Sequence, residues 1–393
     1  MKNNSIMKKV TVGLLAMLIT GAAFSFPNQV QAAEASGTTQ TQTKTTQESQ
    51  KNQVAPSLLS LNSFIDEVTK VNSKLKLLDN KIVVQEKRCK IALQKRDEAN
   101  RKFNLNEAEL LSNKRESLLN PLQAQNQLDE LKWEKENEVK SLRVEATKLF
   151  YQYVFKQQEI DSQSKVIDKA QKEYDIAKKK VEVGDQNSLS LNQSENALSL
   201  AKQKLETLKV EKTGIQMKIN SLLERELTQA FELKAEPLNI SEYTNNDLDS
   251  IITKKKESGH SVVKLQKSYE ETKIQYYIQG YAMGIPSARE ELEYSMMDTE
   301  NNIKNEKAAI DLKVRSDYNS ILNLKDDIEI AKLTYDLNTK LHSISELKYD
   351  RGLISISDYL KTSGDKETAL TNYNKAQLDY AVAVMNFKLY IEE

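Results

Sequence analysis

The chain has 393 residues, and its 57 basic and 57 acidic side chains cancel to a net charge of zero. This balance provides no basic field for nucleic acid. With two histidines far apart, one cysteine, and no glycine-rich phosphate loop, HExxH motif or paired-cysteine spacing, we expect no enzyme, no cofactor site, no metal site and no intrachain disulfide.

The N-terminal region has the features of an export signal over residues 1–33. Lysines precede an apolar stretch, Val10–Phe26, and small residues suited to cleavage follow at Val30 and Ala32. A retained membrane anchor is the alternative, but the apolar stretch is short and is interrupted by glycine and threonine. Residues 34–55 are rich in Thr and Gln and predict a disordered linker. No later apolar run is long enough for a transmembrane helix in the mature chain.

Residues 56–235 are predicted to form the first of two long-helix repeats. Apolar residues at helical spacing predict a nearly continuous helix over Ser57–Asn120, followed by a break at Pro121. The helix that leads to Gly184 has apolar residues every seven positions: Ile160, Ile167, Tyr174 and Val181. The helix after it has the same period: Leu191, Leu198 and Leu205. A strict seven-residue repeat predicts left-handed supercoiling with knobs-into-holes packing.

Residues 236–393 are predicted to form the second repeat, after a polar joining stretch, Glu236–Asp249. A helix is expected over Leu248–Tyr281, with a break at Pro286. The next helix carries the row Ile330, Leu337 and Ile344 toward Gly352. Beyond that glycine, alanines alternate with aromatic residues: Ala369, Ala376, Ala383, Tyr373, Tyr380 and Phe387. The two prolines lie 63 and 66 residues before the two glycines, which indicates a duplication.

The two glycine turns, 168 residues apart, are the most specific features of the chain. A glycine tolerates the left-handed backbone that closes a helix, and Ser or Asn can cap the helix that follows. The turn residues proposed to bind a partner are Gly184, Asp185, Asn187, Ser188, Gly352, Leu353, Ile354 and Ser355. The sequence therefore predicts an all-α fold made of two tandem repeats of long antiparallel coiled-coil hairpins.

Around the second turn the chain resembles the TolC-like outer membrane efflux family. The resemblance is strongest over Ala331–Tyr390 and weaker around Gly184. It implies a homotrimer in which each subunit contributes two hairpins to a helical tunnel that carries drugs, toxins or proteins out of the cell. It also implies that the hairpin tips meet a membrane-fusion adaptor and an inner-membrane pump.

The same resemblance assigns a gate to the tip of the second hairpin. Tyr349 and Asp358 match polar gate positions of the family. Ile354 stands where a gate arginine can occur, and Lys361 stands where a second acid can occur, so half of the gate chemistry is missing. Asp358 also suits a simpler role, as an acid at a helix start that the amide dipole favours.

The chain departs from the family at the opposite end of each half, where family members have the strands of a membrane β-barrel. Here Phe103–Asn120 predicts helix and Tyr276–Met297 predicts a loop or short turn. Neither segment offers two strands long enough to span a bilayer. We expect a TolC-like helical barrel protomer without a membrane β-barrel, located in the cell envelope or outside the cell. An outer-membrane location is expected only if a barrel exists.

Three other residues are expected to have structural roles. His260 and His342 lie among ordinary helix residues, so we expect each to face solvent or to sit at a helix end. Trp133 is expected to be a partly buried residue of a helix seam.

These patterns favour an exported channel or duct component of an efflux or secretion system. A non-transporting coiled-coil structural or interaction protein of the cell wall or surface remains the alternative, and a hollow oligomer would distinguish the first from the second. A helical pore-forming toxin is disfavoured because the most apolar candidate hairpin segment, Tyr380–Met385, is too short to enter a bilayer.

Overall fold

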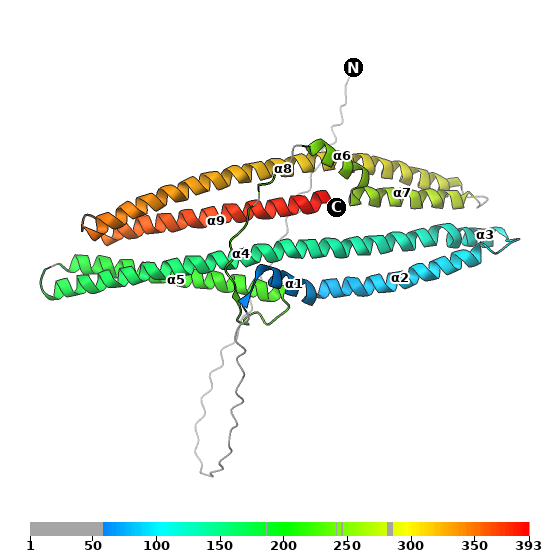
Figure 1. Ribbon diagram of the computed structural model, residues 1–393. Helices are drawn as coiled ribbons and strands as arrows, with labels where there is room; N and C mark the ends of the chain where they lie inside the picture. Colours follow the sequence, from blue (N-terminus) through cyan, green and yellow to red (C-terminus); the bar gives the residue numbers. More distant parts are fainter. Residues whose placement is uncertain (1–57, 186, 241, 245–246, 281–285, 393) are drawn as a thin grey trace, which may run out of the picture. The chain divides into compact units, whose positions relative to one another are not determined.

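The computed structural model describes most of the chain after the predicted linker. The described residues are 58–185, 187–240, 242–244, 247–280 and 286–392. They belong to one unit, Ala55–Glu393, and the predicted export signal and linker lie outside them. Within these residues the structure is almost entirely helical, apart from a two-residue parallel pair between β1 (Leu58–Leu59) and β2 (Glu232–Leu233) (Figure 1). The predicted all-α class is confirmed.

In the first half, one long helix packs against shorter helices along both parts of its length. Its elements are α1 (Leu61–Val71), α2 (Ser73–Ala99), α3 (Glu107–Lys114), the π-helical turn η1 (Arg115–Leu119), α4 (Asn120–Glu182) and α5 (Ser188–Leu222). Helix α4 packs against α2 over one part of its length and against α5 over the other. Because it has 63 residues, it extends about 95 Å.

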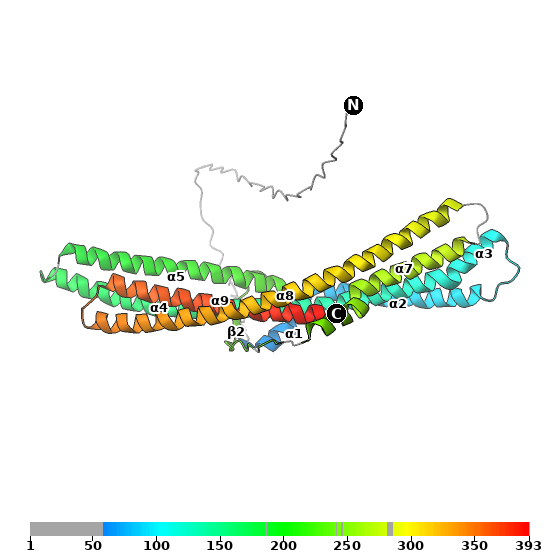
Figure 2. The same cartoon turned by 90° about the horizontal axis from the view of Figure 1, so that it is seen from above.

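The second half repeats this order. Its elements are α6 (Leu248–Ser258), α7 (His260–Gln279), α8 (Pro286–Asp350) and α9 (Ile356–Glu392). Helix α8, with 65 residues, packs against α7 and α9 as α4 does against α2 and α5. The predicted repeats of long antiparallel hairpins are confirmed. Both glycine turns lie at one end of the unit, with α3 and the end of α7 at the other (Figure 2). The predicted boundary at 235/236 falls between β2 and α6.

The prediction of one nearly continuous helix over Ser57–Asn120 was wrong, because asparagines end and restart it. Asn72 separates α1 from α2, and its side chain accepts a hydrogen bond from the Leu75 amide at 2.9 Å. Helix α2 ends at Ala99, and the chain then turns back through Asn104, whose φ is 56°. Asn106 begins α3 with a capping box. Asparagine caps helices well and visits the left-handed region more readily than most residues.

The predicted break at Pro121 was also wrong, because the helical path continues through the proline. The single π turn Arg115–Leu119 lies directly before it. A proline inside a helix lacks an N–H and its ring presses on the carbonyl one turn earlier, here that of Ser117. A locally widened turn accommodates this defect, so α3, η1 and α4 form one path.

Two expectations for the second half were wrong as well. Leu248–Tyr281 is not one helix, because Gly259 adopts an extended conformation between α6 and α7. Tyr276–Met297, expected to be a loop or short turn, is mostly helical in its described part: α7 continues to Gln279, and α8 begins at Pro286, where the break was predicted. Proline suits the first turn of a helix, and the residues that follow it are good helix formers.

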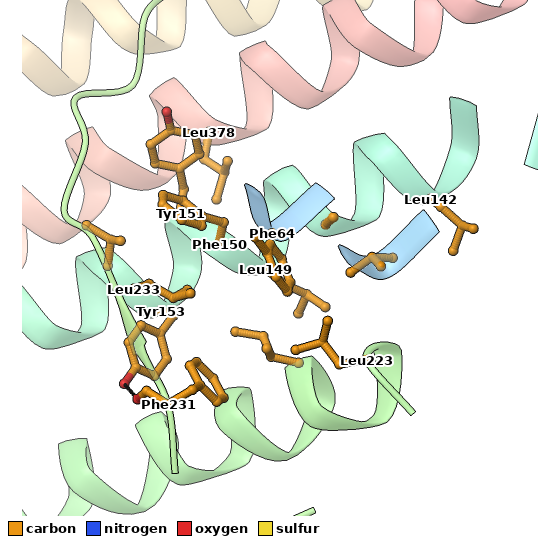
Figure 3. Close-up of a cluster of buried hydrophobic side chains, with 14 of the residues drawn as sticks. Phe64, Leu142, Leu149, Phe150, Tyr151, Tyr153, Leu223, Phe231, Leu233 and Leu378 are labelled. Atoms are coloured by element: carbon orange, nitrogen blue, oxygen red, sulfur yellow. Dashed lines mark hydrogen bonds between the residues drawn. The ribbon is translucent and has the colours of Figure 1, made fainter. Parts of the chain in front are cut away.

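Each half has its own hydrophobic core. In the first, Phe64 of α1 packs against Phe150 of α4 among residues of α2, α5 and β2, and Leu378 of α9 joins this core from the second half (Figure 3). In the second, the core joins α6, α7, α8 and α9 around Phe387. Corresponding buried positions recur 168 residues apart: Leu142 and Ile310, Ala146 and Val314, Ile219 and Phe387. The duplication therefore extends from the turns into the packing.

Two buried glutamines connect α4 to the helices beside it. The Gln85 side chain of α2 donates from Nε2 to the Ala124 carbonyl, and Gln163 of α4 donates to the Ala201 carbonyl of α5, both at 2.9 Å. Both side chains are almost fully buried. Each seam of the first half therefore contains a polar contact whose acceptor is the facing main chain.

Candidate functional site

The two glycine turns have the same geometry. Gly184 has φ of 76° and Gly352 has φ of 69°. The Asp185 amide donates to the Lys180 carbonyl at 2.8 Å, and the Leu353 amide donates to the Lys348 carbonyl at 2.9 Å. Each glycine amide also donates to the carbonyl three residues earlier. These paired bonds define a Schellman closure, and the predicted left-handed glycines are confirmed.

The predicted capping residues start the returning helices. The Asn187 side chain accepts from the Ser190 amide at 3.2 Å, directly before Ser188 begins α5. In the second turn, the Ser355 hydroxyl accepts from the Asp358 amide at 3.1 Å and donates to the Asp358 carboxylate at 2.8 Å. Asp358 thus takes part in a capping box at the start of α9.

Replacing Gly352 with valine is expected to destabilise the chain by about 1–2 kcal/mol, because a β-branched residue is strained at positive φ. The midpoint of urea unfolding, followed by helical circular dichroism, measures this loss. Gly364→Val is the matched control, since Gly364 lies inside α9 with nothing within 4 Å of an added Cβ. An unchanged midpoint and an unchanged oligomer for Gly352→Val would contradict the strain argument.

The tips present mostly polar, exposed side chains. Asp185, Asn187 and Ser188 are exposed, Leu353 is 68% exposed, and Ile354 is half-buried. Their role in binding a partner stays a prediction.

Behind the tips, a polar contact joins the two hairpins; we call it the tip junction. It consists of Lys169 from α4, His342, Glu346 and Tyr349 from α8, and Tyr359 from α9. The Lys169 Nζ lies 3.4 Å from the Glu346 Oε1, 3.7 Å from the centre of the Tyr359 ring and 5.1 Å from that of Tyr349. The Tyr359 ring centre lies 5.2 Å from those of Tyr349 and His342.

The electrostatics of the tip junction keep Lys169 charged. Burial alone would lower the pKa of Lys169, but Tyr359 and Glu346 outweigh burial and raise the pKa above its ordinary value. A single cation on α4 therefore interacts with groups from both helices of the second hairpin.

The sequence pointed to Tyr349 but missed the rest of the tip junction. His342 neither faces solvent fully nor ends a helix; it is half-buried in α8, about two turns before the end of that helix, so that expectation was wrong. Its spacing of seven from Tyr349, which places both on one face of the helix, was the available signal. Tyr349 lies within the tip junction, whereas Asp358 is exposed in the helix cap, so the two proposed gate residues have different surroundings.

A groove of about 450 Å³ runs beside the tip junction, between α4, α5 and α9. Small and apolar residues contribute to its lining, among them Val166, Ala197, Ala201, Leu360 and Gly364. Polar residues also line it, including Lys204, Lys361 and Ser355. Ser355 is thus one predicted tip residue that borders a concave surface.

An exposed apolar stripe runs along α8 toward the tip; we call it the α8 row. It consists of Ile330, Leu333, Leu337, Leu341, Ile344 and Leu347, which are 48–63% exposed. The heptad row noted in the sequence, Ile330, Leu337 and Ile344, makes up half of this stripe. The seam with α9 uses other residues, such as Tyr335, whose ring stacks on Tyr373. A heptad pattern identifies a face that needs a partner, without saying which partner it is.

A second polar contact between the halves lies toward the other end, between α4 and α7. The Trp133 and His260 rings stack with centres 3.5 Å apart, and Glu130 accepts hydrogen bonds from Lys264 at 2.7 Å. Lys267 donates to Asp129 at 2.6 Å. Trp133 is half-buried and His260 begins α7, as the sequence predicted.

The described residues contain no group of three His, Cys, Asp or Glu side chains arranged to hold a metal ion. In the same part of the chain, no helix combines the length and the apolar character that crossing a bilayer requires.

The chain is similar in structure to several bacterial channels. No family model and no curated protein matches the sequence. The outer membrane channel CmeC of Campylobacter jejuni matches with a TM-score of 0.60 at 12% identity, over 84% of this chain and 85% of that one. A membrane protein of Pseudomonas aeruginosa matches with 0.63 at 8% identity, over 84% and 90%. The open MtrE outer membrane channel of Neisseria gonorrhoeae matches with 0.57 at 11% identity, over 84% and 88%. The chain therefore has the fold of the TolC-like outer membrane channels.

Proposed function

We propose that this chain is an exported duct component of a cell-envelope efflux or secretion system and that it acts as a homo-oligomer. The α8 row carries the proposal. A monomeric soluble protein rarely leaves a contiguous apolar stripe of this kind in water. Since Ile330, Leu337 and Ile344 repeat every seven residues, the partner that fits them is another long helix.

A second copy of the chain supplies such a helix. The first hairpin also exposes large apolar side chains: Ile176, Val183, Leu189, Leu200 and Val210. When the α8 row of one copy packs on the first hairpin of the next, the contact is head-to-tail, and such contacts form closed rings when the rotation closes. Three copies is the number that the resemblance implies.

The glycine turns are the proposed docking surface for an adaptor of the membrane-fusion type, which would link the duct to an inner-membrane pump. The exposed residues around Gly184 and Gly352, together with the adjoining groove, offer this partner polar and small side chains. Tyr349 and Asp358 are the proposed polar residues of the duct entrance.

Electron microscopy of the mature chain, residues 34–393, tests the proposal directly. The expected result is a hollow ring in end views, with a mass near three copies by sedimentation. A single elongated monomer at all concentrations would contradict the duct and would favour the coiled-coil spacer of the cell wall or surface instead.

A further inference from the structure

His342 is placed where a charge would disturb the contact between the hairpins. Its ring is half-buried against Tyr359, and its Nδ1 atom is buried without a hydrogen-bond partner. An imidazole in this setting packs as a neutral ring. Once protonated, it would need an acceptor for its second N–H and would become a third cation beside Lys169 and Lys366.

The two carboxylates that face His342 already hold the first hairpin. Glu346, one turn later on α8, pairs with Lys169 at 3.4 Å. Glu367 of α9 accepts a hydrogen bond from the Ser162 hydroxyl at 2.8 Å. Since Lys169 and Ser162 both belong to α4, either carboxylate that turns to a protonated His342 is withdrawn from a contact between the hairpins.

We propose that His342 is a pH switch: its protonation withdraws Glu346 or Glu367 from α4 and loosens the first hairpin from the second at the glycine-turn end. The device acts within a single chain, so it does not depend on the duct or on a transported substrate.

The neighbouring charges give the switch its direction. Burial lowers the pKa of His342 below its ordinary value, and Lys366 and Lys169 lower it further against the opposing effect of Glu346 and Glu367. A histidine whose pKa is lowered in the folded state stabilises that state above its ordinary pKa and loses this contribution as the pH falls through the lowered value. The Tyr359 ring also faces His342, with 5.2 Å between the ring centres.

Glu173 of α4 has the opposite effect. Burial raises its pKa, and nearby Asp350 raises it further against Lys169 and Lys180. Its protonation on acidification therefore favours the packed state. Loosening in acid would therefore not come from Glu173, and the His342 variants described below identify the group responsible.

The contact near the other end should not follow the same switch. There His260 lies 3.0 Å from a Glu130 carboxylate oxygen and stacks on Trp133, so a proton on His260 already has an acceptor. Since the chain has only these two histidines, each serves as the control for the other.

Distances between the two tips measure the switch. Spin labels are attached at Asp185→Cys and Leu353→Cys in a Cys89→Ser background, and the labelled chain is diluted with unlabelled chain so that only distances within one chain contribute. Pulsed electron resonance compares about pH 7.5 with about pH 5, which bracket ordinary histidine titration. We expect one short distance at neutral pH and a severalfold larger population of longer distances in acid.

Variants of the two histidines show which residue causes the change in distance on acidification. His342→Gln should keep the short distance at both pH values, His342→Lys should show the long distances already at neutral pH, and His260→Gln should respond to acid as the parent does. Helical circular dichroism checks that each variant is folded. An acid response that persists in His342→Gln, or a parent chain whose tips do not respond to pH, would overturn the proposal.

Discussion

Mature chains that carry both Leu337→Lys and Ile344→Lys are expected to remain monomeric at concentrations where the parent forms an oligomer. Burying one Leu or Ile side chain contributes about 1.5–3 kcal/mol, so losing two at each interface raises the dissociation constant about 100-fold or more. Because both side chains are more than half exposed in the single chain, its own stability should change little. Sedimentation velocity over a concentration series measures the change.

The matched control moves the same two lysines one residue back along the helix. Asp336→Lys and Ser343→Lys introduce at least as much positive charge on exposed positions of α8 beside the α8 row. This variant should assemble as the parent does. Were both variants to assemble equally well, the α8 row would not be the interface between copies.

Replacing Phe150 with alanine should cost about 3–5 kcal/mol of unfolding free energy, the range for removing a large side chain from a core. Phe150 is fully buried, and its ring centre lies 6.3 Å from that of Phe64 and 5.4 Å from that of Tyr151 (Figure 3). The packing contacts that are lost lie between α1 and α4. The cost is large because helices of this kind depend on tertiary packing more than on their intrinsic helix propensity.

Urea unfolding of the Phe150→Ala variant measures this cost. Phe103→Ala is the control, since the same side chain is 82% exposed at the turn between α2 and α3 and its removal should have almost no effect. Equal losses in the two variants would contradict the assignment of the core around Phe150.

The glycine turns could be predicted because local chemistry alone decides them. A positive φ at Gly184 and Gly352, followed by Asn187 and Ser355 as caps, needs no knowledge of distant residues. The interruption at Asn72 was missed because the apolar spacing continues through it, so periodicity outweighed the cap signal. Pro121 was misjudged because the π turn before it relieves a clash that the sequence pattern does not reveal.

The tip junction could be predicted only in part, because it lies between the repeats. The partners Lys169 and Glu346 are 177 residues apart, and nothing in the periodicity of either helix pairs them. The α8 row shows a second limit of prediction from sequence. Its heptad spacing marks a face suited to another helix, and within the described residues this face is exposed.

The buried side chains of Gln85 and Gln163 bear on where the hairpin tips lie along the long axis of the helices. Coiled coils with a seven-residue period can slide by one period and still match apolar side chains. The carbonyls that accept from Gln85 and Gln163 belong to small alanines, however, and a slide by seven residues would place a serine or a leucine opposite each buried amide instead. Each buried glutamine thus favours one axial alignment of the two helices that it joins. With that alignment fixed, identical copies standing around a common axis would end at the same height, and their ends could contact one flat partner surface together.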